Sequence, residues 1–255
     1  MKTRYWIALL VVFSVLSLFI GNIEIGWHDL ATGNREKLEI LALTRLPRLV
    51  SIIITGAGMS VCGLIMQQIS RNKFVSPTTG ASVDAAGLGL LIAAIFFSAS
   101  GYLASLLLTL GCALLGTFAF ILLLKRVQLR SVVLAPLLGI MLGGVIQSLS
   151  VFLAYRFEMV QSLNAWMMGS FTLVMKGRFE LLYLSLPMVV IAFLYANKFT
   201  IAGMGEEIST NLGLKYRHVV NVGLTIVSLV TATVVVIVGA VPFLDLIIPN
   251  LASLF

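Results

Sequence analysis

The chain has 255 residues, of which 60% are hydrophobic and only 11% are charged, and its formal net charge is +7. A soluble domain usually carries about 25% charged residues, so this composition excludes an ordinary soluble domain, a disordered chain and a disulfide-rich scaffold. Each membrane-spanning helix needs about 20 apolar residues. The apolar content therefore predicts an all-α polytopic membrane protein.

Seven apolar runs can be read as complete transmembrane helices, and an eighth begins before the C-terminus. None of them shows the alternation of apolar and polar residues that marks a membrane β-strand. The first run follows a basic N-terminus but lacks a small-residue cleavage site, so we expect it to be retained as a helix. The seven runs cover residues 5–21, 49–69, 85–99, 102–124, 132–154, 181–197 and 219–241, and the eighth begins near Phe243.

Basic residues flank these runs instead of forming one patch, which argues against nucleic-acid binding. If the N-terminus is cytoplasmic, ten Lys and Arg residues fall on the inner side and seven on the outer side. The positive-inside rule thus favours a multi-pass protein of the cytoplasmic (inner) membrane with a cytoplasmic N-terminus. The inner set is Lys2, Arg4, Arg71, Lys73, Lys125, Arg126, Arg130, Lys198, Lys215 and Arg217. The outer set is Arg35, Lys37, Arg45, Arg48, Arg156, Lys176 and Arg178.

Side chains that carry enzyme chemistry are scarce. The sequence has no G-x-x-x-x-G-K-[ST] loop for ATP and no Cys/His cluster at metal-binding spacing, so we expect neither an enzyme nor a bound cofactor or metal. Cys62 and Cys112 lie within apolar runs and are expected to pack as thiols. Asp84 and Asp245 lie near span boundaries beside turn residues; we expect them to cap helices, and a proton relay is the alternative.

Two segments of the second span contain more polar or small residues than a lipid-facing helix needs. Residues 45–48 (RLPR) are expected at its outer mouth, where the arginines either snorkel to the interface or meet an acidic partner. Residues 56–63 are rich in glycine, which permits close helix packing. At least one of Gln67 and Gln68 should face protein or a water path.

Two further segments lie between spans. Residues 198–217 form a long loop on the cytoplasmic side, in which Ile208 and Leu212 predict a short amphipathic helix that Gly213 ends. Such a helix either binds a partner or rests on the membrane surface, and its acids disfavour an anionic lipid surface. Residues 164–171 predict a short interfacial helix near a pore mouth, with Trp166 as its anchor or simply as part of an aromatic belt.

These segments occur in an order that is found in a known family. From residue 40 onward, the chain resembles the permease family of bacterial ABC importers for iron–siderophore complexes, haem and cobalamin. The family motifs are R-L-P-R, G-x-x-L-x-x-x-G-x-x-x-Q, R-N-P, L-G-E-E-x-A-x-x-L-G and G-x-I-x-F-V-G-L-x-x-P-H. Their counterparts here are Arg45–Arg48, Gly56–Gln67, Arg71–Lys73 with Pro77, Met204–Glu207 with Leu212 and Gly213, and Gly239–Asn250.

The resemblance implies a type II ABC importer permease fold, which has ten transmembrane helices per subunit, within one domain over residues 1–255. It implies three kinds of partner: ABC ATPase subunits, a second permease subunit (identical or different), and a periplasmic or lipoprotein siderophore-binding protein. Residues 198–217 correspond to the coupling loop. The implied ATPase-coupling residues are Gly205, Glu206, Glu207, Leu212 and Gly213; those for docking the binding protein are Arg45 and Arg48; those for the pore and packing are Gln67, Gln68, Gly139, Gly143 and Gly144.

Three residues depart from the family pattern: Lys73 stands where the family has Pro, Asn250 where it has His, and Asp245 where it has Gly. The first two resemble the subgroup for catecholate siderophores such as petrobactin and anguibactin. The chain also ends where the family pattern continues, which predicts a C-terminally truncated subunit. The predicted function is import of a ferric siderophore driven by a separate ATPase; the alternatives are an ion-coupled secondary transporter and a non-transporting fragment.

Overall fold

The computed structural model of the chain describes residues 3–20, 35–97, 101–127, 133–172, 174–177 and 179–254. Every regular element in these ranges is a helix, which confirms the predicted all-α class. Of the predicted topology, Lys2, Arg130 and Arg178 lie outside the described residues. The helices are α1 (Thr3–Phe19), α3 (Arg35–Ile40), the π-helix η1 (Leu41–Arg45), α4 (Leu46–Ser70), α5 (Ser82–Phe96), α6 (Gly101–Arg126), α7 (Leu134–Arg156), α8 (Val160–Met167), the 3₁₀-helix η2 (Phe179–Leu184), α9 (Ser185–Leu194), α10 (Ala196–Ala202), α11 (Glu206–Asn211), α12 (Tyr216–Ile237) and α13 (Leu244–Ala252).

Four helical stretches among the described residues are long and apolar enough to cross a membrane. They are Lys37–Ser70, Leu103–Arg126, Leu134–Arg156 and Tyr216–Ile237. A fifth results if η2 and α9 are counted with α10 as one span, although this pair is bent by 62°. Helices α1 and α5 are apolar but shorter, so the count of seven complete spans stays a prediction.

The predicted sixth span, residues 181–197, is not one straight helix. Helix α9 ends at Leu194, and α10 continues in another direction. The Nζ of Lys198 lies 4.2 Å from the centre of the Tyr195 ring, and this cation–π contact stabilises the bend. Helix α10 therefore belongs with the predicted coupling loop rather than with the span.

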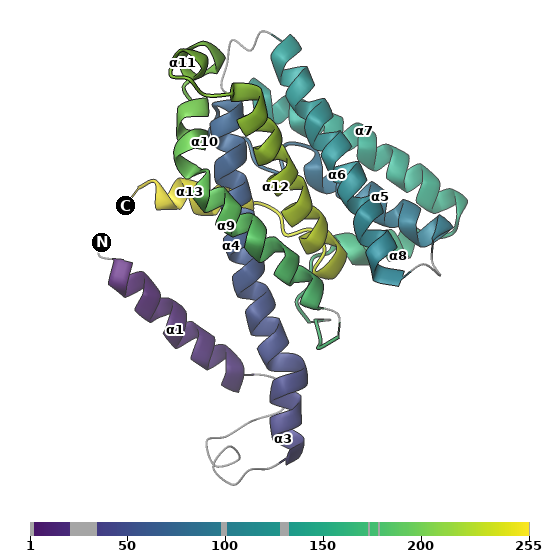
Figure 1. The fold of residues 1–255 in the computed structure, drawn as a ribbon. Coiled ribbons are helices and arrows are strands. Elements are labelled where there is room, and N and C mark those ends of the chain that lie inside the picture. Colours follow the sequence, from purple (N-terminus) through teal and green to yellow (C-terminus); the bar gives the residue numbers. More distant parts are fainter. Residues whose placement is uncertain are drawn as a thin grey trace.

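Helix α4 runs along most of the length of the molecule, with α3 at one end and α11 at the other (Figure 1). Helices α12 and α13 both pack against α4, α6 packs against α12, and α5 packs between α6 and α7. Met59 and Met66 of α4, Phe120 of α6 and Val227 of α12 are fully buried in the main hydrophobic core. Helix α1 contacts η1 and α4 but stands apart from the rest of the bundle.

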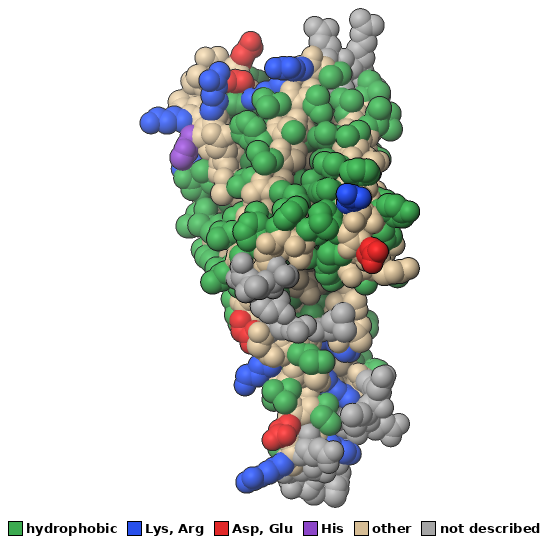
Figure 2. Space-filling model, turned by 90° about the vertical axis from the view of Figure 1, so that its right-hand side faces the viewer, with side chains coloured by type: hydrophobic (Ala, Val, Ile, Leu, Met, Phe, Trp, Pro, Cys, Tyr) green, Lys and Arg blue, Asp and Glu red, His purple; other side chains and the backbone are tan. Residues whose placement is uncertain are grey.

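Charged side chains are distributed along the same axis. Figure 2 shows acidic and basic side chains gathered at the end that carries α11 and again around α3, with a hydrophobic band between them that few charges interrupt. A band of exposed apolar side chains between two charged ends is the surface that a bilayer requires. The chain is thus organised as a multi-pass membrane protein.

The start of α4 contains a proline whose missing N–H is compensated from elsewhere in the chain. Pro47 lies in the first turn of α4, so the carbonyl of Leu43, one turn earlier, lacks the helical donor that residue 47 would normally supply. The backbone N–H of Lys176 donates to this carbonyl at 3.1 Å. This bond fixes the segment before η2 to the π-helical turn that precedes α4.

A largely buried loop of residues 71–81 joins α4 to α5. Val75 and Ser76 have no exposed surface. The loop starts at Arg71 and ends at Ala81, both in the left-handed conformation, with φ of 55° and 61°. Because the loop turns back into the bundle, α5 begins at Ser82, before the start at residue 85 that the sequence predicts.

Helices α4 and α13 touch at Gly63. A Cβ atom at this position would overlap the backbone carbonyl of Asp245 and would lie 3.2 Å from the Cγ of Pro249. The absence of a side chain therefore lets α13 lie directly on α4. Gly56, two turns earlier on the same helix, has no atom within 4 Å of the corresponding position.

We expect Gly63→Ala to lower the free energy of unfolding by about 1–3 kcal/mol, because the added methyl group must push α13 away from α4. Gly56→Ala is the matched control: it adds the same group to the same helix in open space, and should leave stability unchanged or raise it by up to about 1 kcal/mol. Thermal unfolding in detergent, followed by circular dichroism, measures both. Equal melting temperatures for the two variants would contradict this packing.

Candidate coupling and translocation sites

The predicted coupling loop contains α10, α11 and the turn into α12. Two glycines with positive φ flank α11: Gly205 has a φ of 112° and Gly213 a φ of 80°. Other residues rarely adopt this conformation. At the end of α11, the N–H of Gly213 donates to the carbonyl of Thr210 and the N–H of Leu214 to that of Ser209, both at 2.9 Å. This is a glycine-terminated cap, and the prediction that Gly213 ends the helix is confirmed.

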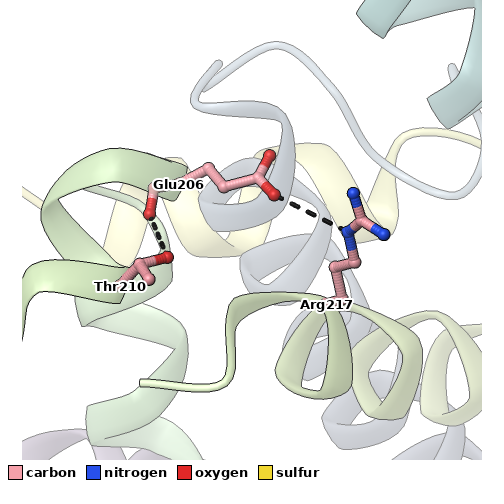
Figure 3. Close-up of polar contacts among 3 residues, drawn as sticks. All are labelled: Glu206, Thr210 and Arg217. Carbon is pink, nitrogen blue, oxygen red and sulfur yellow. Dashed lines mark hydrogen bonds and ion pairs between the residues drawn. The ribbon is translucent and has the colours of Figure 1, made fainter. Parts of the chain in front are cut away.

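Ser209 fastens α11 to α10. Its side chain is fully buried, and its hydroxyl lies 2.8 Å from the carbonyl oxygen of Ile201 in α10 and 2.5 Å from that of Gly205. The neighbouring hydroxyl of Thr210 instead donates to the carbonyl of Glu206 within α11, at 2.7 Å (Figure 3). One side of α11 is therefore anchored and the other side is exposed.

The exposed side of α11 is both acidic and apolar. Ile208 and Leu212 are 51% and 63% exposed. Glu206 and Glu207 occupy the first turn, and Oε1 of Glu206 lies 3.8 Å from Nε of Arg217 in α12 (Figure 3). Both partners of this pair are exposed, so it adds little stability. Exposed apolar side chains beside acids, at one end of the bundle, are typical of a surface that meets another protein.

The two arginines predicted to dock a binding protein differ in their surroundings. Arg45 is only 9% exposed, and its Nη1 donates to the carbonyl of Leu18 near the end of α1, at 2.5 Å. Arg45 therefore provides a hydrogen-bond donor for one of the carbonyls that have no partner within the helix at the C-terminus of α1. Arg48 is half-buried, and its Nε is buried without a hydrogen-bond partner among the described residues. Its docking role and that of Arg45 stay predictions.

Both glutamines at the end of α4 contact protein. Gln67 is 9% exposed, and its Nε2 donates to the carbonyl of Lys73 at 3.0 Å. The Oε1 of Gln68 occupies the place where a Cβ of residue 203 would lie, so Gly203 is needed for this contact. The end of α4 is thus joined both to the loop 71–81 and to the coupling loop.

Helix α7 has the smallest buried share of the four candidate spans. Two of its predicted packing glycines contact other segments of this chain rather than a second subunit. The carbonyl of Thr79 fills the Cβ position of Gly139, and the carboxylate of Asp84 fills that of Gly143. Gly144 faces open space. The exposed face of α7 also carries Ile140, Met141, Val145, Leu149 and Phe152. This face is available to a second subunit or to a translocation path.

Polar bonds between α13 and the loop 71–81 are not evident from the sequence. Asp245 has no exposed surface and accepts two hydrogen bonds from Thr78, one from its backbone N–H at 2.7 Å and one from its hydroxyl. The Nδ2 of Asn250 donates to the carbonyl of Lys73 at 3.0 Å. Of the three departures from the family pattern, Asp245 and Asn250 therefore both bind the loop 71–81, which contains the third, Lys73.

This arrangement revises the interpretation of the two acids near span boundaries. The N-cap positions are Ala81 in α5 and Phe243 in α13, so neither Asp84 nor Asp245 is an N-cap residue. Asp84 lies against α7, and Asp245 binds a distant loop. Only the combination of a buried acid with the Ser- and Thr-rich segment after Lys73 hints at this bond in the sequence.

An apolar bundle with charged ends, an exposed acidic helix at one end and a sparsely covered, glycine-bearing span define a multi-pass membrane protein. Comparison with known proteins makes the assignment specific. The chain belongs to the FecCD transport family, which it matches over residues 9–255.

Named relatives are permease proteins. The chain is 50% identical to the petrobactin import system permease protein YclN of Bacillus subtilis over 255 residues, which cover all of this chain and 81% of that protein. It is 39% identical to the ferric-anguibactin transport system permease protein FatD of Vibrio anguillarum, with 93% and 76% covered. A solved structure of a metal-chelate type ABC transporter in an inward-facing conformation has a similar fold, with a TM-score of 0.79 at 25% identity over 97% of this chain and 79% of that one.

We expect Ser209→Ala to loosen α11 from α10, because the hydroxyl that reaches the carbonyl of Ile201 is lost. Amide hydrogen exchange across residues 203–214 should accelerate by about tenfold, which corresponds to about 1.4 kcal/mol for one buried hydrogen bond. Thr210→Ala is the control, since its hydroxyl is bonded only within α11. If both variants exchange at the same rate, Ser209 does not anchor the helix.

Proposed function

We propose that the chain is the membrane permease subunit of an ABC importer that takes up a ferric siderophore, while a separate subunit hydrolyses ATP. The observation that carries the proposal is the 50% identity, over the full chain, to the permease of a petrobactin import system. The structure supports it through α11, which is anchored on one side by Ser209 and presents acids and apolar side chains on the other.

In this proposal, the coupling contact with the ATPase consists of Gly205, Glu206, Glu207, Leu212 and Gly213. ATP-driven closure of two ATPase subunits moves α11, and this movement changes the tilt of α7, so that a path between two permease subunits opens inward. Helix α7 suits this role because much of its surface is uncovered and Gly144 leaves room for a close neighbour. No covalent step is involved.

We infer that the ligand is a ferric siderophore of the catecholate type, because the relatives are named for petrobactin and anguibactin. Such a ligand is large and anionic. The ligand must leave the path as well as enter it, so the path is best lined by groups that bind the ligand weakly. Helix α7 carries no charged residue between Leu134 and Ala154, which agrees with a path of this kind.

The same proposal assigns a partner to each end of the molecule. The end with α11 faces the cytoplasm and the ATPases, and the N-terminus lies on that side of the inner membrane. The end with α3 faces outward, where a binding protein docks at Arg45 and Arg48. Helices α3 and α11 lie at opposite ends of the molecule, as two separate partner surfaces require (Figure 1).

Reversing the charge of α11 tests the coupling contact. In proteoliposomes with the complete transporter and its binding protein, Glu206→Lys combined with Glu207→Lys should reduce ATP-driven uptake of ferric siderophore by about tenfold or more, because a surface complementary to two acids would then meet two lysines. Hydrolysis of ATP should continue. Radioactive iron uptake and phosphate release, measured on the same preparation, give both quantities.

Glu39→Lys is the control, since it makes the same change at an exposed position in α3, at the opposite end of the molecule. It should leave coupling intact. Unchanged iron accumulation in the Glu206 and Glu207 variant would overturn the coupling assignment. If the unmodified transporter shows no ATP-dependent uptake of any ferric siderophore, the proposed function itself is wrong.

A further inference from the structure

The loop 71–81 touches three parts of the chain that are distant in sequence. At its start, the Nη1 of Arg71 lies 3.1 Å from the position that a Cβ on Gly205 would occupy, so the loop begins against the residue that opens α11. Farther along, the carbonyl of Thr79 lies against Gly139 of α7. Between these two contacts, the loop is bonded to α13 through Lys73 and Thr78.

Side chains supply most of the hydrogen bonds that this irregular backbone needs. The N–H of Phe74 donates to Oδ1 of Asn72 at 2.9 Å, and that of Ser76 donates to Oγ1 of Thr79 at 2.9 Å. These bonds are internal to the loop, so they shape it without fixing its position. Non-helical backbone within a membrane protein is tolerated only where such partners exist.

Three side chains instead fix the loop to helices, through four hydrogen bonds. Gln67 of α4 and Asn250 of α13 both donate to the carbonyl of Lys73, each at 3.0 Å. The third partner is the carboxylate of Asp245, which accepts hydrogen bonds from the backbone N–H and the hydroxyl of Thr78. Two of these three attachments come from α13, and the charge-assisted bonds to Asp245 are the stronger kind. Gly63 holds α13 itself on α4.

We propose that Asp245 and Asn250 are positioning residues for transport: they fix the loop 71–81 on α13, so that displacement of the coupling loop is passed through Arg71 and Thr79 to α7. This inference rests on the proposed function, and it assigns a role to residues that touch neither ATPase nor ligand. Without the attachment to α13, the loop would shift by itself when α10 and α11 move, and the displacement would not reach α7.

A double-mutant cycle isolates the attachment. Asp245→Ala removes both accepting oxygens, and Thr78→Val removes the hydroxyl at almost unchanged volume. In reconstituted full transporter, each variant should lower the ratio of siderophore imported to ATP hydrolysed by about threefold. The double variant should fall no further than Asp245→Ala alone, because that substitution already removes the bond that Thr78→Val breaks. Ser253→Ala, at the residue that follows α13, is the control, since its hydroxyl donates to the backbone carbonyl of Asn250 and not to the loop.

The outcomes separate positioning from simple stability. A reduced import-to-hydrolysis ratio at unchanged yield of assembled transporter supports the inference. Lower thermal stability with an unchanged ratio overturns it. If Asp245→Ala fails to assemble, Asn250→Ala, which removes the more exposed of the two attachments, must lower the ratio or the inference is wrong. Absence of ATP-dependent import by the unmodified transporter would instead overturn the proposed function.

Discussion

Backbone that leaves the helical conformation inside an apolar bundle must still find hydrogen-bond partners, and this requirement organises the centre of the molecule. The loop 71–81 is largely buried, with left-handed residues at both ends, and its peptide groups are bonded by side chains. Those partners come from α4, from α13 and from the loop itself. Each carboxylate oxygen of the buried Asp245 accepts a hydrogen bond. These bonds offset the cost of removing the carboxylate from water.

The same loop connects the coupling loop, at one end of the molecule, with α7 in the bundle. Gly203 and Gly205 allow Gln68 and Arg71 to lie against the coupling loop, and Gly139 allows Thr79 to lie against α7. Small residues therefore occur where the end of α4 and this loop meet the coupling loop and α7, the two parts proposed to move, and polar bonds occur where the loop is attached. The contact of the buried Thr79 with Gly139 is close-packed, and such contacts transmit displacement because they resist compression.

Much of this architecture could be predicted from the sequence. Long apolar runs fix the existence of α4, α6, α7 and α12, and the glycine after Leu212 fixes the end of α11. The bend at Tyr195 could not be predicted, since residues 188–194 before it are all apolar and contain neither glycine nor proline. The attachment of Thr78 to Asp245 spans 167 positions along the chain, and local patterns carry no information about such a pairing. Likewise, Arg45 looks like an interfacial cation in the sequence, but its carbonyl partner lies on α1.

The most direct test of this account is the distance between the loop and α13 during the transport cycle. Spin labels at Lys73 and Ser253, both exposed, report that distance by pulsed electron paramagnetic resonance. A second pair at Thr210 and Val145 reports the position of α11 relative to α7. The account predicts that the second distance changes between the nucleotide-free and ATP-bound transporter while the first stays constant. A change of similar size between Lys73 and Ser253 would contradict it.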